Sequence, residues 1–393
     1  MKALLFERKV ARYAAARVAS EVLPGGGARV GPLRLVDTDP PDLPGPGWER
    51  IRPRLSGICG SDLATVDGRS TRYFDPIVSF PFVPGHEVVA DRDDDSRVVI
   101  EPVLGCVARG ISPLCEACAR GDLGNCERIA FGHIEPGLQS GFCCDTGGGW
   151  STFMVAHESQ LHAVPAEMSD DAAVMVEPTA CAVHAVMANV EPGAVVAVLG
   201  AGTLGLSVTA AVRQHAAPQM LITGAKHPQQ RALAADLGAD LVVEPDELTR
   251  AVRRATGSLA AGAQLTGGAD IVLDCVGSES SIADALAMVR PRGAVVLVGM
   301  PGSVKLDLTT LWHRETKLIG AYAYGTETML DGTQRRTFDL AFDLVRAARL
   351  ERLVSATYPL SRYRDAIEHA ATAGRRGSVK IAFDMRNERE RNR

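Results

Sequence analysis

Apolar residues in the middle of the chain follow the pattern of a sheet whose strands alternate with helices. Residues Ala194–Leu199 form a continuous apolar run, which is typical of a strand buried on both faces. A helical apolar pattern extends from there to about His215. Shorter apolar strands and helices then follow at 220–223 and 231–237, 270–274 and 281–289, 294–299 and 317–320. This order predicts a doubly wound parallel sheet of the α/β class.

The segments on either side of this region predict a strand-rich structure. The first 50 residues are punctuated by Pro and Gly and predict short strands and loops, with a helical patch near 11–22. Further expected elements are strands at 48–55, 88–90 and 97–100, helices at 338–348 and from about 358, a strand at 379–383 and a frayed charged tail at 386–393.

Composition narrows the class of protein. A chain of 393 residues is too long for one compact core, so we expect two domains. The net charge of -5 favours neither nucleic acid nor an anionic membrane as a partner. No apolar run reaches the roughly 20 residues that span a bilayer, and Met1–Glu7 does not read as a signal peptide. We therefore expect a cytoplasmic protein with a small-molecule substrate and without nucleic-acid or membrane partners.

A glycine-rich turn joins the first strand of the predicted sheet to its helix. In a dinucleotide-binding turn the first glycine makes the turn, the second admits the pyrophosphate, and the third lets helix and strand pack closely. The helix N-terminus attracts the phosphate charge. The predicted cofactor site consists of Gly200, Gly202, Thr203, Leu204 and Gly205, with Gly224, Ala225, Lys226 and Val276 after later strands.

Cys59 and His86 lie in two short glycine-containing segments, Gly57–Asp62 and Gly85–Glu87. Thiolate sulfur and imidazole nitrogen are zinc ligands, and a catalytic zinc needs three protein ligands and one open position. The glycines permit the sharp turns that would bring the two segments together. Taken alone, the pair could equally be a buried thiol and a satisfied core histidine.

Four further cysteines form a compact array with the spacing C-x8-C-x2-C-x7-C: Cys106, Cys115, Cys118 and Cys126. A C-x2-C turn can place two thiolates on one ion, and two more cysteines complete a tetrahedron. The chain has nine cysteines, an odd number that does not favour a disulfide framework. We predict a closed structural zinc site, with redox or unrelated thiols as the alternative.

Taken in order, the Cys59 and His86 segments, the four-cysteine array, Glu177-Pro178 and the Gly200–Gly205 turn resemble the zinc-dependent medium-chain dehydrogenase/reductase family. The resemblance covers the chain from about Pro40 onward. It implies a Rossmann doubly wound parallel sheet inserted in a β-rich GroES-like catalytic domain. The implied catalytic domain is 1–178 with 325–393, and the implied dinucleotide-binding domain is 179–324. A homodimer or homotetramer is also implied.

The resemblance further implies a role for each catalytic residue. Cys59 and His86 match the first two catalytic zinc ligands, and Glu177 is similar to the third in the sorbitol and glucose dehydrogenase branch. Ser61 matches the hydroxyl that bonds the substrate oxygen and starts proton transfer. Asp62 matches a supporting carboxylate, and Glu87 a carboxylate beside the metal. The implied reaction is hydride transfer between NAD(P) and an alcohol, polyol or sugar-like substrate, with two zinc ions per chain.

The sequence departs from the family pattern in three places. Ser112 stands where the first cysteine of the metal lobe is usual, so Cys106 would have to substitute through a longer loop. Ala64 stands where some relatives have a histidine that passes the proton to solvent. The stretch 9–33 has no counterpart that we can assign.

The residues after the second strand bear on the choice of cofactor. NAD-binding proteins hold the ribose hydroxyl with an acidic residue about 20 residues past the glycine turn. Here Gly224–Pro228 contains no carboxylate, and Lys226 can meet a 2′-phosphate. This favours NADP; the alternative is an NAD-linked or dual enzyme in which Lys226 is a solvated surface charge.

Two other functions remain open at this point. An NADPH-dependent reductase of C=C or imine bonds with the same fold would lack the catalytic zinc, and the presence of Cys59, His86 and Glu177 argues against it. A zinc-bearing nucleic-acid-binding protein built on Cys106–Cys126 would belong to a different class. The negative net charge and the complete dinucleotide turn argue against that function.

Overall fold

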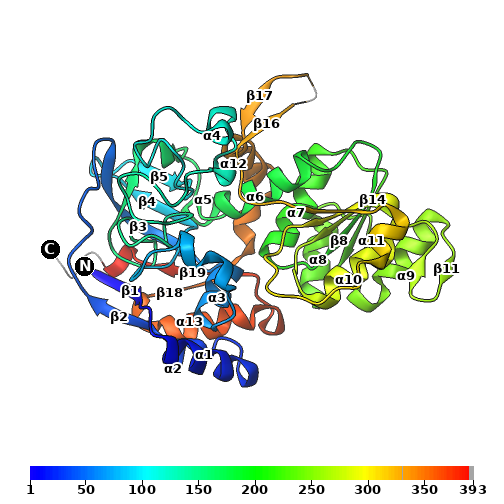
Figure 1. Cartoon of the computed structure of the whole chain (residues 1–393), viewed down its shortest axis with the longest axis horizontal. Coiled ribbons are helices and arrows are strands. Elements are labelled where there is room, and N and C mark those ends of the chain that lie inside the picture. The colour runs from blue at the N-terminus through cyan, green and yellow to red at the C-terminus, as the bar shows by residue number, and fades with distance from the viewer. Residues whose placement is uncertain (330, 389–393) are drawn as a thin grey trace. The chain divides into compact units, whose positions relative to one another are not determined.

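The computed structural model describes residues 1–329 and 331–388, and the chain divides into two compact units (Figure 1). One unit comprises Met1–Glu177 and Arg349–Arg393, and the other comprises Pro178–Ala348. Residues 389–393 of the predicted frayed tail lie outside the described part of the chain. Among the described residues, none of the helices combines the length and hydrophobicity that crossing a bilayer requires.

The second unit extends further along the chain than the resemblance implied. Residues 325–348 were assigned to the first domain, but they belong to the second unit. Here α12 packs against α7, and Glu327 lies 2.7 Å from His184 Nδ1 and accepts a hydrogen bond from Thr337 Oγ1 (2.8 Å). These contacts place the boundary after α12. The segment consists of β16 (Thr326–Thr328), β17 (Gln334–Arg336) and α12 (Thr337–Ala348).

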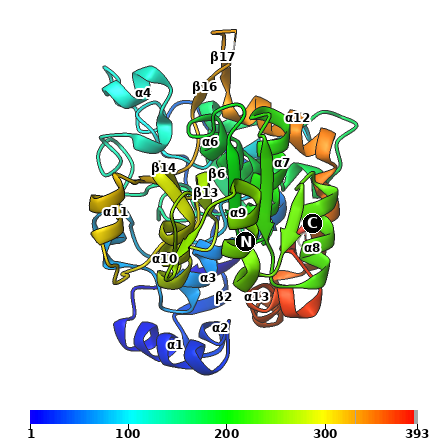
Figure 2. The same cartoon turned by 90° about the vertical axis from the view of Figure 1, so that its right-hand side faces the viewer.

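A six-stranded sheet in the order β10-β9-β8-β13-β14-β15 organises the second unit (Figure 2). All its neighbouring strands are parallel. The strands are β8 (Val195–Leu199), β9 (Met220–Gly224), β10 (Leu241–Val243), β13 (Ala269–Asp274), β14 (Val289–Leu297) and β15 (Lys317–Gly320). The doubly wound sheet predicted from the apolar runs is confirmed, whereas β10 was not among the predicted strands.

Helices connect these strands and cover the sheet. They are α7 (Thr203–His215), α8 (Pro228–Asp236), α9 (Pro245–Thr256), α10 (Glu279–Met288) and α11 (Thr309–Arg314). Another helix, α6 (Val176–Met187), precedes β8. Val195, Ala197 and Leu199 of β8 share a core with α9 and α10. Val196 and Val198 point to the opposite face and are also fully buried. Burial on both faces explains why this strand is a continuous apolar run. A short hairpin, β11 (Ala260–Ala261) and β12 (Gln264–Leu265), follows α9.

A second sheet, in the order β18-β19-β3-β4-β5-β7 with β6 paired to β3, forms the first unit. Its strands are β3 (Trp48–Gly57), β4 (Val88–Asp91), β5 (Arg97–Ile100), β6 (Met154–His157), β7 (Leu161–Ala163), β18 (Val354–Tyr358) and β19 (Lys380–Asp384). β19 lies antiparallel to β3, with Ala382 opposite Gly57. The C-terminal strand therefore begins beside the segment that leads to Cys59, where the N–H of Ile58 donates to the carbonyl oxygen of Ile381 (2.9 Å).

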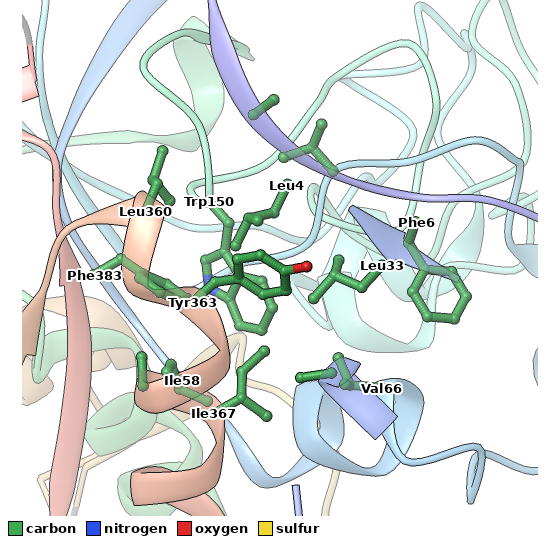
Figure 3. Close-up of a cluster of buried hydrophobic side chains, with 14 of the residues drawn as sticks. Leu4, Phe6, Leu33, Ile58, Val66, Trp150, Leu360, Tyr363, Ile367 and Phe383 are labelled. Atoms are coloured by element: carbon green, nitrogen blue, oxygen red, sulfur yellow. The ribbon is translucent and has the colours of Figure 1, made fainter. Parts of the chain in front are cut away.

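The core of the first unit joins the beginning and the end of the chain (Figure 3). Leu4 and Phe6 come from β1 (Lys2–Phe6), which pairs with β2 (Leu33–Asp37). Tyr363 and Ile367 come from α13 (Tyr363–Ala371), and Phe383 from β19 packs edge-on against Trp150 at 5.1 Å. This core holds the flanks of α3 in place, because Ile58 and Val66 belong to it.

The unassigned stretch 9–33 forms two helices, α1 (Val10–Val22) and α2 (Gly27–Val30), of which the first was predicted. They are attached to the C-terminal end of α3 (Gly60–Val66). Asp67 accepts hydrogen bonds from the backbone N–H groups of Gly25 and Gly27, both at 3.0 Å. A Cβ on Gly27 would lie 2.1 Å from the carbonyl oxygen of Val66, so only glycine permits this approach. The extra segment thus supports the helix whose other end carries Cys59.

Candidate active site and metal centres

The N-terminus of α3 fixes the position of Cys59. Cys59 is the N-cap residue, and its backbone N–H donates to Asp62 Oδ2 at 3.0 Å while its side chain accepts from the third amide of the helix. Such a reciprocal cap satisfies amides that have no partner within the helix. The acidic residue in the first turn also suits the positive end of the helix dipole.

Three donor groups meet at this helix end. The sulfur of Cys59, a ring nitrogen of His86 and a carboxylate oxygen of Glu87 all lie within 4.8 Å of one another. His86 and Glu87 are buried, while Cys59 keeps partial exposure. A thiol, an imidazole and a carboxylate are the donor types that zinc prefers, so the group fits a metal centre that a small molecule could reach.

Asp62 is positioned to orient the imidazole. Its Oδ1 lies 3.5 Å from His86 Nδ1, and both atoms are buried without a hydrogen-bond partner among the described residues. Nδ1 therefore faces Asp62, and Nε2 is left for a metal. Burial alone would lower the pKa of His86, but Asp62 and Cys59 outweigh burial and raise this pKa well above its usual value. The same negative charges would favour a bound dication.

Glu87 forms a buried ion pair with a residue from the far end of the chain. Lys380 Nζ, on β19, donates to Glu87 Oε2 and to the carbonyl oxygen of Ile58, the latter at 3.3 Å. Both side chains are almost fully buried. A Cβ on Gly57 would lie 2.0 Å from Glu87 Oε2, which explains why glycine precedes the Cys59 turn.

Electrostatics keep Lys380 charged in this position. Burial lowers its pKa, but the neighbouring Glu87, Cys59 and Glu177 outweigh burial, and the net shift is upward. Glu177 lies in the first turn of α6 and is buried. Its carboxylate is outside the group formed by Cys59, His86 and Glu87. The assignment of Glu177 as third ligand thus stays a prediction, and the structure offers Glu87 as a nearer carboxylate.

Ser61 occupies the second position of α3, is half-buried, and accepts a hydrogen bond at its carbonyl oxygen from Thr65 Oγ1 (2.9 Å). Ala64, the position without a proton-relaying histidine, lies one turn further along the same helix. Thr65 Oγ1 is also 2.9 Å from Ser70 Oγ.

The four cysteines of the array come together in a separate lobe around α4 (Glu116–Arg120). All four are buried, and their sulfur atoms lie within 4.8 Å of one another. Cys126 Sγ is 3.7 Å from Cys106 Sγ and 4.0 Å from Cys115 Sγ. A tetrahedral zinc with Zn–S bonds of about 2.3 Å requires sulfur separations of about 3.8 Å, so the geometry fits. Cys106 thus supplies the fourth sulfur of the group, which Ser112 at the usual position cannot supply.

Backbone amides stabilise negative charge on these sulfur atoms. The amides of Cys106, Cys115 and Cys118 each donate to a sulfur of the set at 3.5 Å. Burial tends to raise the pKa of Cys115, but hydrogen bonds from the backbone amides of Cys118 and Glu127 and from the thiols of Cys118 and Cys106 outweigh burial and lower this pKa to about 7. Burial raises the pKa of Cys118 and of Cys126. Without a metal, negative charge therefore lies mainly on Cys115, and a bound cation would deprotonate the remaining thiols.

Two glycines of the dinucleotide turn are required by the backbone, and a third leaves open space in front of the helix. Gly200 has φ +90°, and a Cβ on Gly205 would lie 2.0 Å from the carbonyl oxygen of Gly200. Gly202 is the N-cap of α7, and a Cβ there would meet nothing within 4 Å. Thr203 and Leu204 begin that helix. The turn therefore presents open space at a helix N-terminus, which is where a phosphate binds.

The other predicted cofactor residues lie at or just after the ends of β9 and β13, the two strands that flank β8. Val276 follows β13 and is 51 % exposed. Asp274 fixes this loop, because its Oδ1 accepts the N–H groups of Val276 (2.9 Å) and Gly277 (3.1 Å). Lys226 follows β9 and is exposed, whereas Gly224 and Ala225 are buried.

Comparison with known proteins assigns the family. A family model described as an alcohol dehydrogenase GroES-like domain matches residues 45–166. A second, described as a zinc-binding dehydrogenase, matches residues 203–337. The chain belongs to the zinc-dependent medium-chain dehydrogenase/reductase family. It is an oxidoreductase that uses zinc and NAD(P) and acts on a small molecule.

Similar proteins span almost the whole chain. L-idonate 5-dehydrogenase of Vitis vinifera is 26 % identical over 90 % of this chain and 93 % of its own length. Sorbitol dehydrogenase of Arabidopsis thaliana is 27 % identical over 87 % of this chain and 89 % of its own. Among solved structures, an oxidoreductase of unknown specificity from Escherichia coli matches with a TM-score of 0.73 at 20 % identity, covering 98 % of this chain and 99 % of its own. The alcohol dehydrogenase of Thermus sp. ATN1 matches with a TM-score of 0.71 at 23 % identity, covering 98 % and 100 %.

Some residues of these sites were not found from the sequence. Lys380 is 293 positions from Glu87, and a single lysine in an apolar C-terminal strand gives no hint of its partner. Arg231 donates to the carbonyl oxygens of Ala225 (3.2 Å) and Lys226 (2.9 Å), so a second cation stands close to Lys226. Its position in the first turns of the helix after Lys226 is the signal that could have identified it.

Proposed function

We propose that the enzyme oxidises a polyol or sugar-like secondary alcohol to the ketone, and catalyses the reverse reduction, with NADP and a catalytic zinc. The observation that carries this proposal is the meeting of Cys59, His86 and Glu87 donor atoms within 4.8 Å at the start of α3. Curated relatives named for sorbitol, L-idonate and D-xylulose support the substrate class. Cys59, His86 and Glu177 are the proposed ligands, with Glu87 as the alternative third one.

The residues of the chain would share the work as follows. Bound zinc supplies Lewis-acid polarisation of the substrate oxygen, and bound NADP supplies the hydride acceptor. Ser61 would accept the proton of the substrate hydroxyl while its own hydroxyl proton passes to water, so that the proton leaves the site. Asp62 holds the imidazole of His86 with Nδ1 turned away from the substrate. Lys380 keeps the charge of Glu87 balanced beside the ligands. The metal-free reduction of C=C or imine bonds is disfavoured, because it would leave this donor set without a role.

Replacing Ser61 with alanine tests the proposed proton transfer. We expect kcat with sorbitol, L-idonate or D-xylulose to fall by about 10²–10⁴-fold, which is the usual contribution of a general acid–base group. KM should change much less. Ser70→Ala removes a nearby hydroxyl that does not belong to the proposed machinery, and its kcat should stay near the wild-type value. An unchanged kcat in Ser61→Ala would contradict the role of Ser61.

The preference for NADP is proposed from Lys226. Its ammonium is exposed beyond β9, and Arg231 adds a guanidinium close by. Glu244 lies 3.2 Å from Arg231 and partly neutralises it, so Lys226 is the freer cation. We expect Lys226→Ala to raise KM for NADP by about ten- to a hundredfold and to leave KM for NAD nearly unchanged, because the loss of one charged hydrogen bond costs about 1.5–3 kcal/mol. Equal effects on both cofactors would contradict this assignment.

A homodimer is the assembly that we propose first, with a homotetramer as the alternative. β15 is an edge strand of the second unit's sheet, and an open edge readily pairs with another strand. Exposed apolar side chains lie near it, among them Trp312 (82 %), Leu308 and Tyr322. We expect Trp312→Glu to shift the mass measured by light scattering towards the monomer. A monomeric wild-type protein would contradict the proposal. Cytoplasmic location and the absence of nucleic-acid and membrane partners also stay proposals.

A further inference from the structure

Arg109 is a fully buried cation in the long spacer between the first two cysteines of the array. It lies three residues after Cys106, in the loop that distinguishes this lobe from the family pattern. Its guanidinium donates only to backbone carbonyl oxygens among the described residues: Leu104 (2.9 Å), Phe131 (2.9 Å), Ile134 (3.3 Å), Glu135 (3.4 Å) and Gly137 (2.6 Å). These bonds give each guanidinium nitrogen at least one acceptor, but they supply no negative charge.

A buried charge without a counter-charge is costly, so the burial of Arg109 requires an anionic group close to it. Burial lowers the pKa of Arg109, and the thiols of Cys143, Cys126 and Cys106 and the carboxylate of Asp145 oppose this shift. Burial raises the pKa of Cys143 to about 11, so Cys143 is a neutral thiol at neutral pH.

Asp145 is a weak counter-ion for Arg109. Its side chain is half-buried, so water screens its charge. Its Oδ2 already accepts the backbone N–H of Glu135 at 2.7 Å. Arg109 is fixed against the segment that runs into Cys106, because its backbone N–H donates to the carbonyl oxygen of Gly105 (3.2 Å) and its Nε to that of Leu104 (2.9 Å). The other groups that oppose the shift are the sulfur atoms of Cys126 and Cys106 in the array. Four thiolates around one Zn²⁺ ion leave the cluster with a net negative charge, and this charge is buried as Arg109 is.

We propose that Arg109 is the buried counter-charge of the four-cysteine zinc cluster and slows the release of zinc from the lobe. The carbonyl oxygens orient the guanidinium, and the cluster supplies the charge that makes its burial tolerable. The long spacer would then add an internal cation to the lobe as well as replacing the usual first cysteine. This inference rests on the proposed zinc site in the lobe.

The test measures the rate at which the full-length chain releases zinc to a chromophoric chelator. Every variant also carries Cys59→Ala, so that only zinc of the lobe is counted. We expect Arg109→Gln to release zinc at least about tenfold faster, in the range typical of groups that support metal ligands. Arg109→Lys keeps the charge without the planar fork and should stay close to the Cys59→Ala chain.

Two controls separate charge from anchoring. Arg128 is half-buried, and its guanidinium donates to the carbonyl oxygen of Pro113 in the same spacer (3.0 Å), so Arg128→Gln should leave zinc release unchanged. The effect of Arg109→Gln should persist in an Asp145→Asn background. The proposal is overturned if Arg109→Gln releases zinc at the unmodified rate, if Arg109→Lys is as fast as Arg109→Gln, or if Asp145→Asn abolishes the effect.

If Arg109→Gln does not fold, the solubility of a double variant shows whether the loss of charge is the cause. Cys126→His lowers the negative charge of the cluster, so it should restore soluble Arg109→Gln protein if charge is the cause. If the double variant is also insoluble, Arg109 is a loop anchor and the proposal fails. If the Cys59→Ala chain with Arg109 intact contains no zinc, the zinc assignment of the lobe fails instead, independently of Arg109.

Discussion

Replacing Lys380 with methionine should lower the free energy of unfolding by about 3–5 kcal/mol, because it leaves the carboxylate of Glu87 buried and unpaired. Lys380 and Glu87 are both almost fully buried, and Lys380 also bonds the carbonyl oxygen of Ile58 just before the Cys59 turn. The loss should therefore be accompanied by weaker zinc binding. Urea unfolding of the metal-loaded and metal-depleted protein would measure both effects.

The matching controls isolate the unpaired charge. The double variant Lys380→Met/Glu87→Gln should be more stable than Lys380→Met alone, since no buried charge is left over. Lys305→Met removes an exposed lysine and should change stability by less than about 0.5 kcal/mol. If Lys380→Met is no less stable than Lys305→Met, the ion pair does not stabilise the fold.

The pair should also give a characteristic pH dependence. The pKa of Lys380 in the folded protein is raised above its ordinary value of 10.5, because the nearby carboxylates and thiol outweigh burial. Its contribution to stability is therefore fully present below pH 10.5 and is lost as the pH rises through the folded pKa.

Replacing Cys59 with alanine should reduce kcat/KM by at least about a thousandfold, because polarisation of the substrate oxygen by zinc is worth several kcal/mol. Cys59 supplies the only sulfur of the donor group at the start of α3 among the described residues. Cys144→Ala is the matched control, since Cys144 is a partly exposed thiol outside both cysteine-containing groups. Activity close to wild type in Cys59→Ala would contradict the proposed catalytic role.

Local features of the fold followed directly from the sequence. The strand Val195–Leu199 is buried on both faces, and steric contacts at Gly205 demand glycine, so the apolar run and the glycine spacing both carry physical information. The meeting of the four cysteines was equally predictable, because a short loop brings residues of this spacing together independently of contacts with the rest of the chain.

Features that depend on distant residues could not be predicted in this way. Lys380 meets Glu87 only because β19 lies next to β3, and no pattern near either residue encodes that pairing. Residues 325–348 group with the second unit because α12 packs against α7, a contact that no pattern near the helix encodes. The burial of Arg109 among five carbonyl oxygens likewise depends on a loop conformation that no periodicity specifies.

The most direct test of the proposed catalytic centre is the zinc content per chain of the wild-type protein and of Cys59→Ala, measured by mass spectrometry of the metal. We expect about two zinc ions in the wild type and one in the variant, because the Cys106–Cys126 lobe keeps its own ion. An equal zinc content in the two proteins would contradict the account, since the Cys59 group would then not be a zinc site.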